Sequence, residues 1–165
     1  MESLKILIPT DFSVQAEFAC LMVKKLEEKT AIDIHFLHVL NIPNTVSIDS
    51  KGGIQTCGEI DVNFVIQQKE IAVRKLESLK VLYGNHINVH LVLGKTTDTI
   101  LDFSSSNSFD LIVMGTKGSS GIKEIISGLE AQIIARRSKI NFCHLSATEK
   151  LINHLFKPII SFYLN

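Results

Sequence analysis

DLIVMGTKGSSGIKEIISG, residues 110–128, joins a short apolar run directly to a series of glycines. The run LIVM is too short and too evenly apolar for a helix, so it predicts a strand buried on both faces of a parallel sheet. Glycine at positions 115, 118 and 128 lets the backbone come close to a ligand. Exposed N–H groups and a helix N-terminus attract an anion. The stretch therefore predicts a site where backbone groups hold phosphates.

The glycine spacing excludes two common nucleotide loops. Two residues separate Gly115 from Gly118, and nine separate Gly118 from Gly128. This pattern fits neither the dinucleotide fingerprint nor the Walker A loop, because no Gly-Lys-Ser/Thr follows. The segment GSSG at 118–121 is not a nucleophile elbow, since that motif needs Gly-x-Ser-x-Gly after a strand. Serine hydrolysis is therefore not expected.

The same spacing resembles the nucleotide loop of the universal stress protein family, where the last glycine precedes serine or threonine. This chain has Leu129 at that position. Other segments are similar to the same family, and together they extend the resemblance over about residues 1–140: KILIPTDFS at 5–13, IHFLHVL at 34–40, GKTTDTILDFSSSNSFDLIVMGTKG at 94–118 and RRSK at 136–139.

Hydrophobic periodicity predicts alternating strands and helices, and hence a parallel α/β sheet. Residues 41–61 show little periodicity and are expected to form a long loop or lid. The last strand is expected at 140–145 or, alternatively, at 157–164. The other expected strands are 6–8, 32–40, 89–93 and 111–114, and the expected helices are 14–28, 62–83, 97–106 and 122–137, the last interrupted at Gly128.

The family resemblance implies a Rossmann-like α/β fold of the adenine nucleotide alpha hydrolase-like type. Its five-stranded parallel sheet would have the order 3-2-1-4-5, with helices on both faces. Ligands of such sheets bind beyond the carboxyl ends of the strands, where the order reverses. Asp11 would then face the glycine loop. One domain is expected at 1–145, followed by an atypical tail at 146–165 that forms the last strand or begins a truncated second copy.

The resemblance also implies the ligand, ATP or another adenine nucleotide, with Mg²⁺ left open. Asp11 would accept hydrogen bonds from the adenine or the ribose, and Val39 would offer backbone groups to the adenine. The alternative for Asp11 is a turn or helix-capping role. Slow ATP hydrolysis or autophosphorylation is the most activity that we expect, because no general base or activated nucleophile stands near the loop. The expected binding residues are Pro9, Thr10, Asp11, Val39, Met114, Gly115, Gly118, Gly128 and Leu129.

Leu129 and Glu130 argue against tight binding. A hydroxyl at position 129 would donate to a phosphate, and losing such a bond costs about 1.5–3 kcal/mol, or roughly ten- to hundredfold in affinity. Glu130 adds a negative charge where the phosphates would lie. Two functions therefore stay open: an adenine nucleotide-binding protein in stress-response signalling, and a dimeric interaction module that has lost the nucleotide.

Composition limits the partners. Lysine plus arginine equals aspartate plus glutamate at 17 each, so no overall field attracts nucleic acid or an anionic membrane. The N-terminus lacks the pattern of a signal peptide, and the apolar segment 151–164 is too short to span a bilayer. We therefore expect a cytoplasmic protein. An exposed edge strand would favour a homodimer.

Cysteine and histidine give no metal pattern. The 3 cysteines are odd in number and lack a C-x-x-C pair, which argues against a disulfide framework and a zinc site. His35 and His38 lie three apart on a strand and so point to opposite faces. No structural metal is expected, and His38 is expected to be packed and hydrogen-bonded.

Overall fold

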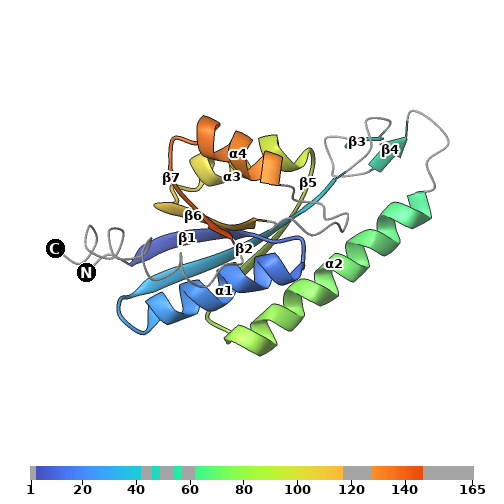
Figure 1. Ribbon diagram of the computed structural model, residues 1–165. Helices are drawn as coiled ribbons and strands as arrows, with labels where there is room; N and C mark the ends of the chain where they lie inside the picture. Colours follow the sequence, from blue (N-terminus) through green and yellow to red (C-terminus); the bar gives the residue numbers. More distant parts are fainter. Residues whose placement is uncertain (1–2, 42–45, 49–53, 57–61, 117–127, 147–165) are drawn as a thin grey trace.

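Five parallel strands form the central sheet of the protein, with two helices on each face (Figure 1). The structure is a computed structural model that describes residues 3–41, 46–48, 54–56, 62–116 and 128–146. The strands of the sheet are β1 (Leu4–Pro9), β2 (Ile32–Leu40), β5 (Asn88–Leu93), β6 (Leu111–Thr116) and β7 (Asn141–Ser146). The helices are α1 (Val14–Glu27), α2 (Val62–Tyr83), α3 (Thr96–Ser106) and α4 (Gly128–Arg137).

The strand order across the sheet is β5-β2-β1-β6-β7, and every pair is parallel. Counted along the chain without the separate β3–β4 hairpin, this is the order 3-2-1-4-5, so the expected fold is confirmed. From β1 the chain adds β2 and then β5 on one side. It then crosses to the other side of β1, where it adds β6 and β7. The order therefore reverses between β1 and β6, and the carboxyl ends of both strands meet there.

Two apolar cores lie on the two faces of the sheet. Residues of β1 and β6 alternate between them, so Ile6 and Val113 pack toward α1 and α2, while Leu7 and Ile112 pack toward α3 and α4. All four side chains are fully buried. A strand buried on both faces needs apolar residues at every position, which explains the unbroken runs ILIP and LIVM.

The helix ends follow local chemistry. Ser13 precedes α1 in extended conformation, and its side chain accepts a hydrogen bond from the N–H of Ala16 at 3.3 Å. Gly84 follows α2 with φ of 107°, a left-handed conformation that glycine adopts without strain. Both signals agree with the helices expected from the sequence.

One region differs from the sequence-based expectation, and a second decides between the two alternatives for the last strand. Residues 41–61, expected as a loop, contain a short antiparallel hairpin of β3 (Val46–Ile48) and β4 (Ile54–Thr56), which lies beyond the carboxyl end of β2 (Figure 1). The fifth strand of the sheet is β7, the first of the two candidates. The second candidate, 157–164, and the expected helical residues 122–127 lie outside the described residues.

Candidate functional site

A small pocket lies at the carboxyl edge of the sheet, beside the reversal of strand order. Its volume is about 210 Å³, open solvent included. Because this volume includes open solvent, it is an upper limit on the space that part of a ligand could occupy. Three segments supply its lining: Thr10 and Asp11 after β1, Leu37, His38 and Val39 of β2, and Thr96 and Ile100 of α3.

The turn after β1 fixes the first two lining residues. The N–H of Thr10 donates to the carbonyl of Leu37 at 2.8 Å, which extends the pairing of β1 with β2 by one residue. Asp11 Oδ1 accepts a hydrogen bond from the N–H of Ser13 at 3.0 Å. The turn role considered for Asp11 is therefore present. It also holds the carboxyl group at the pocket, so the two roles are compatible.

His38 supports this turn from the other face of β2. Its Nδ1 lies 2.8 Å from the carbonyl oxygen of Thr10, and its ring centroid lies 4.5 Å from that of Phe12. Burial lowers the pKa of His38 below its ordinary value of 6.5, and the charge of Lys75 acts in the same direction. The neutral ring thus donates through Nδ1 to Thr10. The expected packed, hydrogen-bonded role is confirmed.

The structure brings together some of the residues expected at the site. Thr10, Asp11 and Val39 line the pocket, and Pro9 ends β1 opposite Leu37. Met114 is fully buried in the core between the sheet and α3 and α4, and it does not line the pocket. Two further expected residues, Gly115 near the end of β6 and Gly128 at the start of α4, lie in neighbouring elements. Gly118 lies outside the described residues.

Leu129 lies in the first turn of α4 with 66% of its surface exposed, so it belongs to neither apolar core. Glu130 follows in the same turn. At the other end of α4, Arg137 donates to Asp98 Oδ1 at 2.9 Å and joins this helix to the first turn of α3. The two helices on this face of the sheet are therefore linked.

Sequence reasoning missed the contribution of α3. Thr96 and Ile100 line the pocket, although neither was expected there. The signal was present, because Thr96 follows β5 by three residues and so lies beyond the carboxyl end of a parallel strand.

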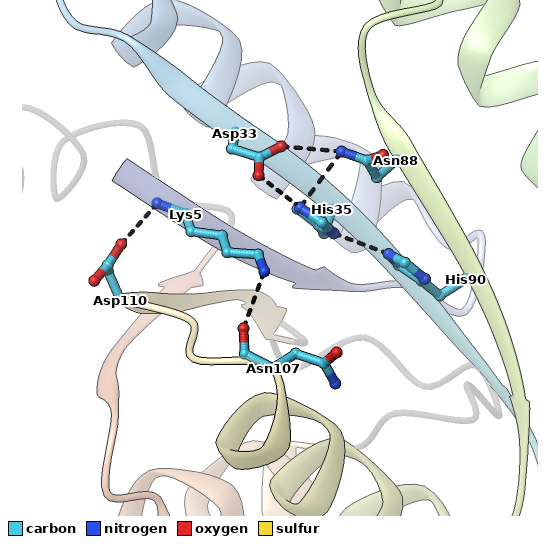
Figure 2. A network of polar contacts seen from close by, with 7 residues as sticks. All are labelled: Lys5, Asp33, His35, Asn88, His90, Asn107 and Asp110. Atoms are coloured by element: carbon cyan, nitrogen blue, oxygen red, sulfur yellow. Dashed lines mark hydrogen bonds and ion pairs between the residues drawn. The ribbon is translucent and has the colours of Figure 1, made fainter. Parts of the chain in front are cut away.

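A second polar cluster lies at the opposite, amino edge of the sheet (Figure 2). His35 Nε2 lies 3.0 Å from Asp33 Oδ2, and His35 Nδ1 lies 2.9 Å from His90 Nε2. Asn88 donates to Asp33 Oδ1 at 2.9 Å, and the N–H of Lys5 donates to Asp110 Oδ2 at 2.8 Å. These contacts join residues at or next to the starts of four strands. They link β2 to β5, and they link β1 to the residue that precedes β6.

Both cysteines of the described part of the chain lie in the apolar core. Burial raises the pKa of Cys20 to about 12 and that of Cys143 to about 11, which keeps both thiols protonated. Cys57 lies outside the described residues. Within the described residues, no group of three or more His, Cys, Asp or Glu side chains is placed to hold a metal ion. None of the helices described is both long and apolar enough to cross a membrane.

The sequence profile described as the Universal stress protein family matches residues 3–142. This chain belongs to the universal stress protein family. Universal stress protein MJ0577 of Methanocaldococcus jannaschii is 26% identical, with 81% of this chain and 89% of that protein covered. Universal stress protein MJ0531 of the same organism is 23% identical, with 81% and 76% covered.

Solved structures of universal stress proteins share the fold. The structure of MJ0577 superposes with a TM-score of 0.65 and 25% sequence identity, over 90% of this chain and 99% of that chain. A universal stress protein solved in complex with cAMP superposes with a TM-score of 0.52 and 15% identity, over 88% and 98%. The family and the fold expected from the sequence are both confirmed.

Proposed function

We propose that this member of the universal stress protein family is a cytoplasmic protein that binds ATP or another adenine nucleotide in stress-response signalling. The observation that carries the proposal is the convergence of Thr10, Asp11 and Val39 on one pocket. The pocket lies at the carboxyl edge beside the strand reversal, where sheets of this type bind ligands. Family membership and the cAMP complex of a fold relative support the same ligand class.

The geometry favours a base lying on β2. Leu37, Val39 and Ile100 belong to one apolar cluster and offer a surface for a flat ring. The carbonyl of Leu37 points toward β1, because it accepts from Thr10. Backbone N–H and C=O groups two residues apart on a strand point to the same side. Those of Val39 therefore point to the same side as those of Leu37, but beyond the end of β1. They can pair with the polar edge of an adenine.

The rest of the nucleotide would extend toward β6. Asp11 follows β1, which lies between β2 and β6 in the sheet, and a carboxylate accepts from ribose hydroxyls. The phosphates would then approach Gly115 and the start of α4, where helix N–H groups favour an anion. Gly118 and a Mg²⁺ ion would complete this end.

The first test uses the purified protein without added nucleotide. Denaturation followed by mass spectrometry identifies any bound molecule, and calorimetric titration measures the affinity for ATP, AMP and cAMP. Asp11→Ala should weaken binding about tenfold or more, since a hydrogen bond to a charged group is lost. Asp102→Asn, an exposed acid on α3, is the control. Wild-type protein that is empty and does not bind millimolar ATP contradicts the proposal.

A second function is favoured by Leu129 and Glu130, which occupy the start of α4 where phosphates would need donors. It is a dimeric interaction module that has lost the nucleotide. β7 has only β6 as a neighbour within the described sheet, and an exposed strand edge can pair with a second copy. Light scattering measures the homodimer. Leu129→Ser separates the two functions, because it strengthens ATP binding only where the phosphates reach α4.

A further inference from the structure

Thr96 carries a buried hydroxyl group without a hydrogen-bond partner. Its residue surface is 3% exposed. Among the buried side-chain oxygen and nitrogen atoms of the described residues, Thr96 Oγ1 is the one that has no hydrogen-bond partner. Buried polar groups in proteins are nearly always hydrogen-bonded, so an orphan of this kind needs an explanation. Thr96 also lines the pocket, where a ligand would reach it.

Local structure fixes the hydroxyl in this place. Thr96 is the first residue of α3, and Lys95 before it makes no side-chain capping bond. The N–H of Gly94 donates to the carbonyl of Leu40 at 3.1 Å, which ties the start of α3 to the end of β2. A side chain at position 94 would collide with Thr99 Oγ1. Glycine therefore allows the backbone at position 94 to lie close to Thr99. Thr96 is thus held against the pocket by the backbone.

The strand order decides which part of a nucleotide reaches Thr96. α3 follows β5, and β5 and β1 lie on opposite sides of β2. Thr96 is therefore at the end of the pocket remote from β6 and Gly115. Its neighbours in the pocket, Val39 and Ile100, are apolar, which suits a ring.

The charged groups near Thr96 balance one another. Asp11 is a lining residue, and Asp98 lies in the same helical turn as Thr96. The hydrogen bond from Arg137 lowers the pKa of the Asp98 carboxyl, so this group stays ionised. Arg137 and Lys95 both pair with Asp98, at 2.9 and 3.6 Å, and are thereby compensated. Charge therefore decides little at this end of the pocket, and the apolar neighbours Val39 and Ile100 favour a neutral heteroaromatic group.

We propose that the Thr96 hydroxyl hydrogen-bonds the polar edge of the nucleotide's base and so acts as a base-recognition residue of the pocket. This inference rests on the proposed function. A hydroxyl donates one hydrogen bond and accepts others, so it can pair with an exocyclic amino group or a ring nitrogen. Base binding would give the orphan oxygen its missing partner.

The test compares Thr96→Val with Thr97→Val. Valine replaces the hydroxyl by a methyl group of similar size. Thr97 is the matched control, because it is the next residue of α3, is also buried and does not line the pocket. Thr96→Val should raise the melting temperature of the ligand-free protein, since it removes an unpartnered buried hydroxyl. It should also weaken ATP and adenosine binding by the same factor, about five- to tenfold. Thr96→Ser should bind within about twofold of wild type.

Each outcome has one meaning. Wild-type protein that binds neither ATP nor adenosine overturns the proposed function and this inference with it. Nucleotide binding that is equal in wild type and Thr96→Val overturns the inference alone. A loss seen with ATP and not with adenosine places the hydroxyl on a phosphate and also overturns it. Thr96→Ala repeats the binding comparison if the valine variant does not fold. A lower melting temperature in a folded Thr96→Val variant shows that the hydroxyl is already partnered and overturns the inference.

Discussion

At the residue scale, the turn after β1 is held in place by its own hydrogen bonds. Thr10 Oγ1 accepts from the N–H of Phe12, and Asp11 Oδ1 accepts from the N–H of Ser13. Phe12 has φ of 63°, a left-handed conformation that costs a residue with a side chain roughly 1–2 kcal/mol. The two hydrogen bonds and the ring contact with His38 offset this cost. The result is a rigid support for Asp11.

Ser13 is the first residue whose contribution can be measured. Ser13→Ala removes the side chain that accepts from Ala16 N–H, so the free energy of unfolding should fall by about 1 kcal/mol. Urea denaturation measures it. Ser78→Ala is the control, because Ser78 lies on the exposed surface of α2 and should change stability by less than about 0.5 kcal/mol. Equal losses in both variants would show that Ser13 does not cap α1.

His38 should make stability depend on pH. Its pKa is lowered in the folded protein, chiefly by burial, from the ordinary value of 6.5. Above pH 6.5 the ring is neutral in both states and its contribution is fully present. As the pH falls below that value, the unfolded chain binds the proton first, so the free energy of unfolding decreases until the folded-state pKa is reached.

The measurement is urea unfolding at pH values above and below 6.5. His38→Asn keeps a donor for the carbonyl of Thr10 but cannot be protonated, so its stability should decline less on acidification than that of wild type. The pKa of His90 is also lowered, by burial and by the charges of His35 and Lys5, so part of the decline should persist. Identical pH profiles for wild type and variant would contradict the role of His38.

At the element scale, α4 is attached to the sheet by few side chains. Ala131 and Ile134 are its buried residues, and Ile134 is completely enclosed in the core with Met114. Ile134→Ala should lower the free energy of unfolding by about 2–4 kcal/mol, because it leaves a cavity under the helix. Ile133→Ala is the matched control, because Ile133 is the neighbouring residue and is partly exposed. It should lower the free energy of unfolding clearly less than Ile134→Ala. Similar costs at both positions would mean that α4 is not packed as described.

Sequence patterns predicted the elements that bury a full face. LIVM and ILIP are unbroken apolar runs because both faces of β6 and β1 are covered. The hairpin escaped prediction because VSI and IQT have only three residues each, too few to show a period. β7 stayed one of two candidates for a related reason. As an edge strand it exposes Asn141 and His144, which interrupt the apolar pattern.

At the scale of the whole molecule, the sequence predicted the edge of the sheet where the candidate pocket lies, but only part of the lining of that pocket. Asp11 and Val39 belong to segments whose family resemblance marks the ends of β1 and β2. Thr96 belongs to a matching segment too, yet its importance depends on burial without a partner. That property arises only when α3 docks against β2, so no local pattern could have predicted it.

The two candidate functions differ in what stabilises the whole protein. A ligand that binds only the folded state raises the free energy of unfolding, by about 2.7 kcal/mol at 100 times its Kd. If the pocket binds ATP, the melting temperature should therefore rise with ATP concentration in wild type and in Asp102→Asn, and much less in Asp11→Ala. Calorimetric scans at fixed protein concentration measure this.

If the protein is instead a dimeric interaction module, the melting temperature should depend on the concentration of the chain and not on that of ATP. Dimerisation also stabilises by mass action, so the melting temperature would rise with the concentration of the chain and stay constant as ATP is added. Scanning both concentrations independently separates the two contributions. A response to ATP that disappears in Asp11→Ala assigns the stabilisation to the pocket, because Asp11 lines it. A response to chain concentration alone assigns it to contacts between copies, and the nucleotide proposal then fails.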